Sequence, residues 1–227
     1  MSIVLYGYWR SLATFRVRAA LNLKGLAYTE TVVDLGRGEQ FGEDFHRINA
    51  QHVLPALEHG GLLLTQSLPI IEYLDETWRR RPLLPDDAAG RARVRALAQI
   101  PTADVHPLIV PRVRSLLEAE FGIDEPGRLK WIRHWFDKGS EAIEARLGDA
   151  GIEGRYAHGD QITLADLALV SHVIGARMFQ ADLQRAPRLA ALADRCLALD
   201  AFASAHPLAQ PGAPAQPSLS RMVAADS

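Results

Sequence analysis

The sequence is poor in cysteine. Cys196 stands alone among 227 residues, which excludes an internal disulfide framework. It lies in the apolar run RCLALDAF, and free cysteine is among the most buried residue types, so a small buried side chain is favoured over a nucleophile. A dominant charge is also missing, since 25 basic residues against 27 acidic ones leave a net charge of −2. This balance argues against a nucleic-acid partner and indicates a small ligand.

Long hydrophobic runs are absent as well. No stretch approaches the roughly 20 apolar residues that a membrane span requires, and no charged start followed by an apolar run indicates a signal peptide. We therefore expect no membrane partner and a cytoplasmic location, and we predict no metal site. With 48% hydrophobic residues the chain can still bury a substantial core, and its length permits one large domain or two small ones.

The first 81 residues alternate strand and helix patterns, which favours an α/β domain. Apolar runs, polar–apolar alternation and turn residues predict the order βαβαββα. The expected strands lie within residues 3–6, 28–33 and 49–65, the last range holding two that meet at Gly60-Gly61, and the expected helices cover residues 15–24, 41–48 and 68–74. Gly25 is expected to end the first helix, and Ser67 is interpreted as the N-cap of the last one.

Polar side chains gather between the first expected strand and the first expected helix. The segment YWRS ends in Ser11, and Thr14 follows three residues later. The N–H groups at the start of a helix lack partners and point outward, so hydroxyls at this place can help to hold an anion. The alternative is that Ser11 or Thr14 only caps the helix.

After residue 81 the pattern changes. The segment RRRPLLPDD at residues 79–87 carries two prolines and indicates a linker, placed at 82–87, before an all-α domain at 88–210. Prolines divide the long helical pattern of 88–117, and a Thr163-x-x-Asp166 capping box opens a later helix. Further helices are expected through residues 129–147, 165–179 and 188–199, with a disordered tail at 211–227.

In this order and spacing the motifs resemble the glutathione transferases, and within them the zeta-class branch with the maleylacetoacetate and maleylpyruvate isomerases. The similarity rests on YGYWRS, RVRAALNLKG, Gln66-Ser67 and the later FQADL and LDAFASAHP. It implies a thioredoxin-like domain at residues 1–81, a cis peptide bond before Pro55, an all-helical second domain and a homodimer.

The resemblance also implies glutathione as the cofactor and assigns site residues. The implied glutathione contacts are Ser11, Thr14, Gln40, Gln51, Leu54, Pro55, Gln66, Ser67 and His106. Ser11 and Arg10 would be catalytic, Ser11 by stabilising the thiolate, since an unperturbed thiol has a pKa of about 8.5. Arg10 and Arg112 would hold carboxylates of an acidic substrate. For His106 the alternative is a satisfied histidine before a proline kink.

Departures from the family pattern fall near the site. Where maleylacetoacetate isomerases have Ser-Ser-Cys-x-Trp, this chain reads SLATF, with Ala13 at the cysteine position, although maleylpyruvate isomerases also lack that cysteine. An arginine of the family pattern is replaced by Met178, with Arg177 one residue earlier. A shift of one residue turns a helical side chain by about 100°, so Arg177 is a doubtful substitute.

Three classes of function remain open. The first is a glutathione-dependent isomerase of a cis-olefinic diacid, which works by thiolate addition, bond rotation and elimination. The second is a general glutathione transferase or peroxidase that acts on electrophiles without carboxylates. The third is a non-catalytic relative that uses the fold for interaction. Ser11, Gln66 and Ser67 argue against the third class, and the arginines favour the first over the second.

Overall fold

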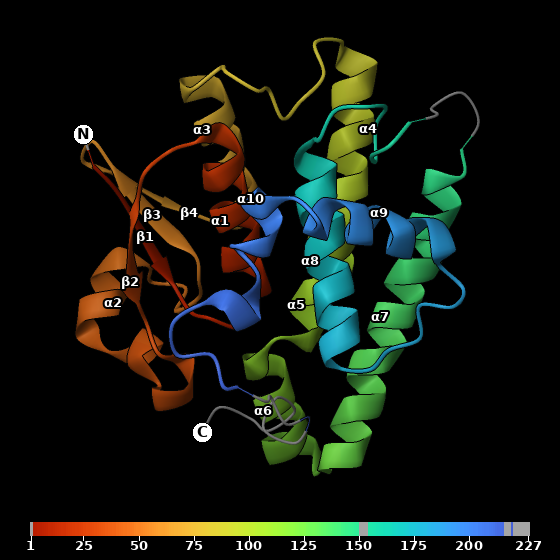
Figure 1. Cartoon of the computed structure of the whole chain (residues 1–227). Coiled ribbons are helices and arrows are strands. Elements are labelled where there is room, and N and C mark those ends of the chain that lie inside the picture. The colour runs from red at the N-terminus through yellow and green to blue at the C-terminus, as the bar shows by residue number, and fades with distance from the viewer. Residues whose placement is uncertain (1, 150–153, 216–218, 220–227) are drawn as a thin grey trace. The chain divides into compact units, whose positions relative to one another are not determined.

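The computed structural model describes residues 2–149, 154–215 and 219. Its contacts form two compact units (Figure 1). The first unit comprises residues 2–82 together with 199–215, and the second comprises residues 83–149 together with 154–198. The first contains the sheet and the second is helical, as the sequence pattern predicted.

The first unit is built on a four-stranded mixed sheet in the order β2-β1-β3-β4. Its strands are β1 (Ile3–Gly7), β2 (Thr29–Val32), β3 (Ala56–His59) and β4 (Leu62–Thr65), and its main helices are α1 (Leu12–Lys24), α2 (Glu43–Ile48) and α3 (Ser67–Thr77). β1 is parallel to β2 and antiparallel to β3, which pairs with β4. The predicted order βαβαββα is confirmed.

The two central strands carry the core of this sheet. Leu5 of β1 lies opposite Leu57 of β3, and neither is exposed. Gly60 and Gly61 join β3 to β4 with φ angles of 59° and 83°, a left-handed backbone that a side chain would strain. The predicted Gly-Gly hairpin is therefore confirmed, although its first strand begins only at Ala56.

Helix α1 is buried around almost its whole circumference. Every residue from Leu12 to Leu21 is buried, including Arg16 and Arg18. The sequence pattern predicted a start at residue 15 and one apolar face, whereas the helix starts one turn earlier. It ends as expected at Gly25, whose φ of 67° places the next N–H on the last helical carbonyls.

Residues 199–215 pack on α1 and so belong to the first unit. The segment contains α10 (Asp200–Ala203) and a short 3₁₀ turn, η4 (Pro207–Ala209). The rings of Phe15 and Phe202 lie 6.3 Å apart, and the Asn22 amide donates to the carbonyl of Ala201 at 3.1 Å. This unit boundary differs from the expected one, which assigned residues up to 210 to the helical domain.

The start of the expected disordered tail is also placed in the structure. The N–H of Ala213 donates to the carbonyl of Gln210 at 3.1 Å, and the Gln210 amide donates to the carbonyl of Ser204 at 2.7 Å. The remaining tail residues 216–218 and 220–227 lie outside the described residues.

The second unit is all helical. Its elements are α4 (Ala88–Gln99), the π-helical turn η3 (Ile100–Val105), α5 (His106–Ile109), α6 (Pro111–Phe121), α7 (Glu125–Leu147), α8 (Leu164–Met178) and α9 (Pro187–Leu197). α8 is buried from Leu164 to Ala176 and packs against α4, α7 and α9. As predicted, prolines divide the 88–117 pattern, with Pro101 in the π turn and Pro111 opening α6.

The capping box at the start of α8 is confirmed as a structural feature. The Asp166 carboxylate accepts from the N–H of Thr163 at 2.7 Å, from its hydroxyl at 3.0 Å, and from the N–H of Ala157 at 2.8 Å. Burial nevertheless raises the pKa of Asp166 to about 6. This side chain therefore supports the fold of the helical unit.

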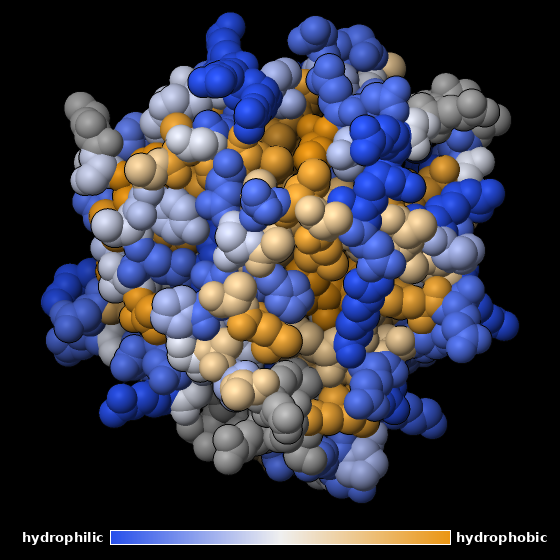
Figure 2. Space-filling view, viewed as in Figure 1, coloured by the Kyte–Doolittle hydropathy of each residue, from blue (hydrophilic) through white to orange (hydrophobic). Residues whose placement is uncertain are grey.

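Among the described residues no helix is both long and apolar enough to cross a membrane. On the face seen in Figure 2, hydrophilic side chains project around smaller hydrophobic areas.

Candidate functional site

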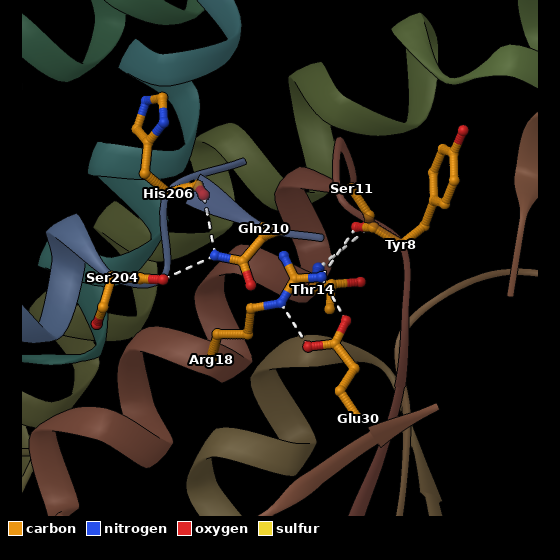
Figure 3. A network of polar contacts seen from close by, with 8 residues as sticks. All are labelled: Tyr8, Ser11, Thr14, Arg18, Glu30, Ser204, His206 and Gln210. Atoms are coloured by element: carbon orange, nitrogen blue, oxygen red, sulfur yellow. Dashed lines mark hydrogen bonds and ion pairs between the residues drawn. The ribbon is translucent and has the colours of Figure 1, made fainter. Parts of the chain in front are cut away.

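The start of α1 places the hydroxyl of Ser11 at a helix N-terminus (Figure 3). The Ser11 oxygen accepts a hydrogen bond from the N–H of Thr14 at 3.1 Å, so this serine caps the helix. A serine hydroxyl can accept and donate at the same time, which leaves its proton available to an anion. Capping and anion binding are thus compatible here. Arg10 lies half-buried in the turn that directly precedes Ser11.

Thr14 contributes to this helix start through its main chain. Its side chain is fully buried, and its hydroxyl oxygen has no hydrogen-bond partner within the described part of the chain. Its methyl group lies under β1, since a Cβ added to Gly7 would be 2.6 Å from it. The contact between Thr14 and a ligand stays a prediction, because the N–H of Thr14 already donates to Ser11 and its hydroxyl is buried.

The start of α3 forms a second polar end in the same unit. Ser67 was interpreted as the N-cap, and that interpretation is wrong because the helix begins at Ser67 itself with Gln66 as the preceding cap residue. Gln66 has φ 68° and ψ 125°, a rare backbone for a residue with a side chain. This backbone turns the chain sharply out of β4 and starts the helix one residue earlier than expected.

A buried arginine links α1 to the start of α3. The Nε of Arg16 in α1 donates to the Ser67 hydroxyl at 3.0 Å, and the two residues are 3% and 5% exposed. Burial lowers the pKa of Arg16 to about 9, so the guanidinium remains charged at neutral pH. Because Ser67 accepts from Arg16, its own proton can point to another acceptor. Sequence reasoning missed Arg16, although an arginine inside an apolar helix was a visible signal.

The loop before β3 brings Gln51 to Gln66. The Gln66 amide donates to the Gln51 side-chain oxygen at 2.9 Å, and both residues are exposed. The loop is shaped by buried Asn49, whose side chain accepts from the N–H of Gln51 at 3.0 Å and donates to the carbonyl of Val53 at 2.7 Å. Two predicted site residues are thus in direct contact.

Gln40 is tied to the same loop from the other side. The Nδ1 of His52 lies 2.7 Å from the main-chain carbonyl of Gln40. Gln40 itself is buried, and its side-chain oxygen has no partner among the residues that the structure describes. Leu54 and Pro55 follow, joined by a cis peptide bond, and lead directly into β3.

The remaining predicted residues lie in the second unit. His106 is half-buried and opens α5, and Arg112 is exposed in the first turn of α6. Arg177 pairs with Asp194 of α9 at 2.7 Å, so it is engaged within the helical unit. Met178 is the last residue of α8.

Two other kinds of chemistry find no support. Cys196 is fully buried, and burial raises the pKa of its thiol, so it stays protonated and inert. Within the described ranges, no group of three or more His, Cys, Asp and Glu side chains could hold a metal ion.

The first unit therefore offers two polar helix starts, and a buried cation from α1 contacts the second of them. Anions are stabilised at helix N-termini by the free N–H groups and the helix dipole. A small ligand with a carboxylate and a second anionic group matches this arrangement.

Two family models match the chain. One is described as glutathione S-transferase, N-terminal domain, and matches residues 1–76. The other is described as glutathione S-transferase, C-terminal domain, and matches residues 131–195.

Curated relatives and solved structures are similar over nearly the whole chain. A probable maleylacetoacetate isomerase of Vibrio cholerae is 45% identical over 94% of this chain and 99% of its own. A maleylpyruvate isomerase of a Ralstonia species is 45% identical over 91% of this chain and 98% of its own. The crystal structure of maleylacetoacetate isomerase from Methylobacterium extorquens AM1, with bound malonate and GSH, has a TM-score of 0.91 at 47% identity and covers 93% of this chain and 100% of that one. The holo structure of a maleyl pyruvate isomerase, described as a bacterial zeta-class glutathione-S-transferase, has a TM-score of 0.91 at 44% identity, with 93% and 100% covered.

Proposed function

Because this chain belongs to the glutathione S-transferase family, we propose that it isomerises a cis-olefinic diacid of the maleylpyruvate or maleylacetoacetate type with glutathione as the cofactor. The observation that carries the proposal is the contact between Arg16 and Ser67, which places a buried cation and an orientable hydroxyl beside the start of α3. A γ-glutamyl carboxylate fits that environment.

The residues of the first unit fit glutathione along its length. Ser67 and Gln66 would hold the γ-glutamyl end, and the extended chain at Leu54 and Pro55 offers main-chain groups to the cysteinyl backbone. The buried Gln40 side-chain oxygen, which lacks a partner among the described residues, is a further polar group near this loop.

When bound, glutathione supplies a thiolate that adds reversibly to the double bond, so that rotation about the resulting single bond and loss of the thiolate give the trans isomer. The hydroxyl of Ser11 would donate a hydrogen bond to the sulfur while its oxygen accepts from the N–H of Thr14. The dipole of α1 adds to the stabilisation of that anion. Arg10 would hold a carboxylate of the diacid. The contacts of Arg112 with the substrate and of His106 with glutathione stay predictions from the resemblance.

The type of substrate is supported by a relative that was crystallised with malonate, a diacid, and GSH. A general glutathione transferase is the second candidate, since Ala13 and Met178 depart from the isomerase pattern. Assays of the purified protein on maleylpyruvate, maleylacetoacetate and a chlorinated aromatic electrophile, each with and without glutathione, separate the two. Turnover of the diacids that depends on glutathione is expected, and turnover of the aromatic electrophile alone would overturn the isomerase assignment.

Ser67→Ala is expected to weaken glutathione binding by about tenfold to a hundredfold. The variant removes a charge-assisted hydrogen bond to the ligand carboxylate, which is worth roughly 1.5 to 3 kcal/mol, and it removes the acceptor of Arg16. Calorimetry measures the dissociation constant. Ser171→Ala serves as the matched control, because that serine is buried in α8 and donates to the Ala168 carbonyl at 2.7 Å. If wild-type protein binds no glutathione at millimolar concentration, the interaction-module alternative replaces the enzyme.

A homodimer and a cytoplasmic location are part of this proposal. The edge strand β4 carries Leu62 and Leu63, which are 51% and 43% exposed. Exposed leucines on an edge strand favour a covering surface, which a second copy of the chain would supply. Native mass measurement at micromolar concentration is expected to give twice the chain mass of 25.0 kDa. A species of 25.0 kDa would contradict the dimer.

A further inference from the structure

Arg18 is a buried cation whose contacts reach the turn before Ser11 (Figure 3). It is 1% exposed and lies in α1, two residues after Arg16. Its Nη2 donates to the carbonyl of Tyr8 at 3.1 Å. The same guanidinium donates from Nε to Glu30 at 2.8 Å, and Nη2 makes a second contact with that carboxylate.

The Tyr8 carbonyl is shared between Arg18 and Ser11. The N–H of Ser11 donates to that oxygen at 3.1 Å. One acceptor therefore ties the side chain of Arg18 to the main chain of Ser11. Because the hydroxyl of Ser11 also accepts from Thr14, the turn is fixed at both its start and its end.

The sheet holds Arg18 in place through Glu30. Glu30 lies in β2 opposite Leu5 of β1, and its side chain is 18% exposed. A Cβ on Gly7 would lie 2.3 Å from the Glu30 carboxylate, so the glycine leaves the room in which this ion pair packs. The charge of Arg18 is therefore paired with Glu30. Its hydrogen bond to the Tyr8 carbonyl can then position the turn before Ser11.

We propose that Arg18, held by Glu30, is a positioning residue that sets the place of the Ser11 hydroxyl through the Tyr8 carbonyl and thereby lowers the pKa of the glutathione thiol at that site. The inference rests on the proposed function, in which Ser11 donates to the sulfur. Hydrogen bonds weaken steeply with misalignment, and a displacement of the order of 1 Å in a supporting group is enough to loosen a site.

The test is a titration of the thiol of bound glutathione, followed by the ultraviolet absorbance of the thiolate. Arg18→Gln is expected to raise this thiol pKa by about half a unit to one unit, in the direction of Ser11→Ala. The dissociation constant of S-methylglutathione, which has no ionisable thiol, is expected to change by less than about twofold. Arg18→Lys, which keeps the charge and loses the planar fork, is expected to stay close to Arg18→Gln.

The matched control is Lys24→Gln at the other end of α1. Lys24 is also buried and pairs with Asp75 at 2.8 Å, so its loss lowers the melting temperature without touching the turn. Its thiol pKa is expected to equal that of the wild type. If Arg18→Gln does not fold, the double variant Arg18→Gln/Glu30→Gln keeps a neutral hydrogen-bonded pair and has the same expected shift.

The proposal is overturned if Arg18→Gln leaves the thiol pKa at the wild-type value, or if Arg18→Lys restores it fully, since the charge alone would then act. A parallel loss of S-methylglutathione affinity would also overturn it, because the role would then be general support of the unit. These outcomes differ from failure of the proposed function, in which the wild type itself binds no glutathione.

Discussion

Replacing Arg10 or Arg112 with methionine is expected to lower kcat/KM for a cis-olefinic diacid by about tenfold to a hundredfold. A guanidinium fork matches a carboxylate in two-point geometry, and such a charge-assisted hydrogen bond is worth roughly 1.5 to 3 kcal/mol. Arg10 sits in the turn before Ser11, and Arg112 is exposed in the first turn of α6. Methionine keeps much of the apolar bulk, so the variants chiefly lose the charge.

Steady-state kinetics with the diacid and with an uncharged electrophile measure this effect. Glutathione affinity and turnover of the uncharged electrophile are expected to change little. Arg177→Met is the matched control, because Arg177 pairs with Asp194 and its loss leaves kcat/KM for the diacid unchanged. If Arg10→Met or Arg112→Met loses every activity together with melting temperature, these arginines brace the fold and the carboxylate role is refuted.

Local sequence patterns were enough to predict much of the fold. Gly60-Gly61 predicted the β3–β4 hairpin because only glycine accepts its positive φ angles freely. Thr163 and Asp166 predicted the start of α8 because a capping box satisfies N–H groups within three residues. In both cases the partners are neighbours in the sequence.

The features that sequence reasoning missed depend on distant partners. Residues 199–215 return to the first unit, where the Asn22 amide reaches the carbonyl of Ala201, which follows 179 residues later. Arg16 and Arg18 are buried in α1 because Ser67 and Glu30 lie beside them in the fold. The hydrophobic periodicity of one helix cannot predict which residues of other elements will pair with its arginines.

The site shows the same limit. Ser11 was proposed as a site residue from its position near a helix start and from the resemblance, and Ser67 from the resemblance, but the cap role belongs to Ser11 and not to Ser67. Gln66 takes the cap position before α3 because of its rare backbone conformation. Residue preferences for the N-cap position do not predict such a conformation. The contact with Arg16 then determines how the Ser67 hydroxyl can point.

The second large predicted effect is a pH-dependent change in the free energy of unfolding, and it arises from a histidine in the helical unit. His172 is buried in α8, its Nε2 lies 2.9 Å from the Ser140 hydroxyl, and its ring packs against Phe136 with centroids 5.1 Å apart. Burial lowers the pKa of His172 from 6.5 to about 4. The unfolded chain therefore binds a proton at this residue below pH 6.5, whereas the folded chain does so only near pH 4.

Because the folded state binds this proton less readily than the unfolded chain, a fall in pH destabilises the fold at His172. The contribution of His172 is fully present above pH 6.5 and is lost as the pH falls toward 4, by about 3 kcal/mol in the free energy of unfolding. Asp166 acts in the opposite direction, because its pKa is raised from 3.8 to about 6 and its protonated form favours the folded state. The pH dependence of the wild type alone therefore mixes the two groups.

A comparison of the wild type with His172→Gln separates them, since Asp166 contributes equally to both proteins. Urea unfolding at pH values from about 7 down to about 4 gives the free energy of unfolding of each. Glutamine cannot be protonated, so the advantage of the wild type over the variant is expected to shrink by about 3 kcal/mol across this range. The shrinkage should begin near pH 6.5, where the unfolded histidine titrates. A difference that stays constant with pH would mean that His172 is protonated as easily in the folded protein as in the unfolded chain.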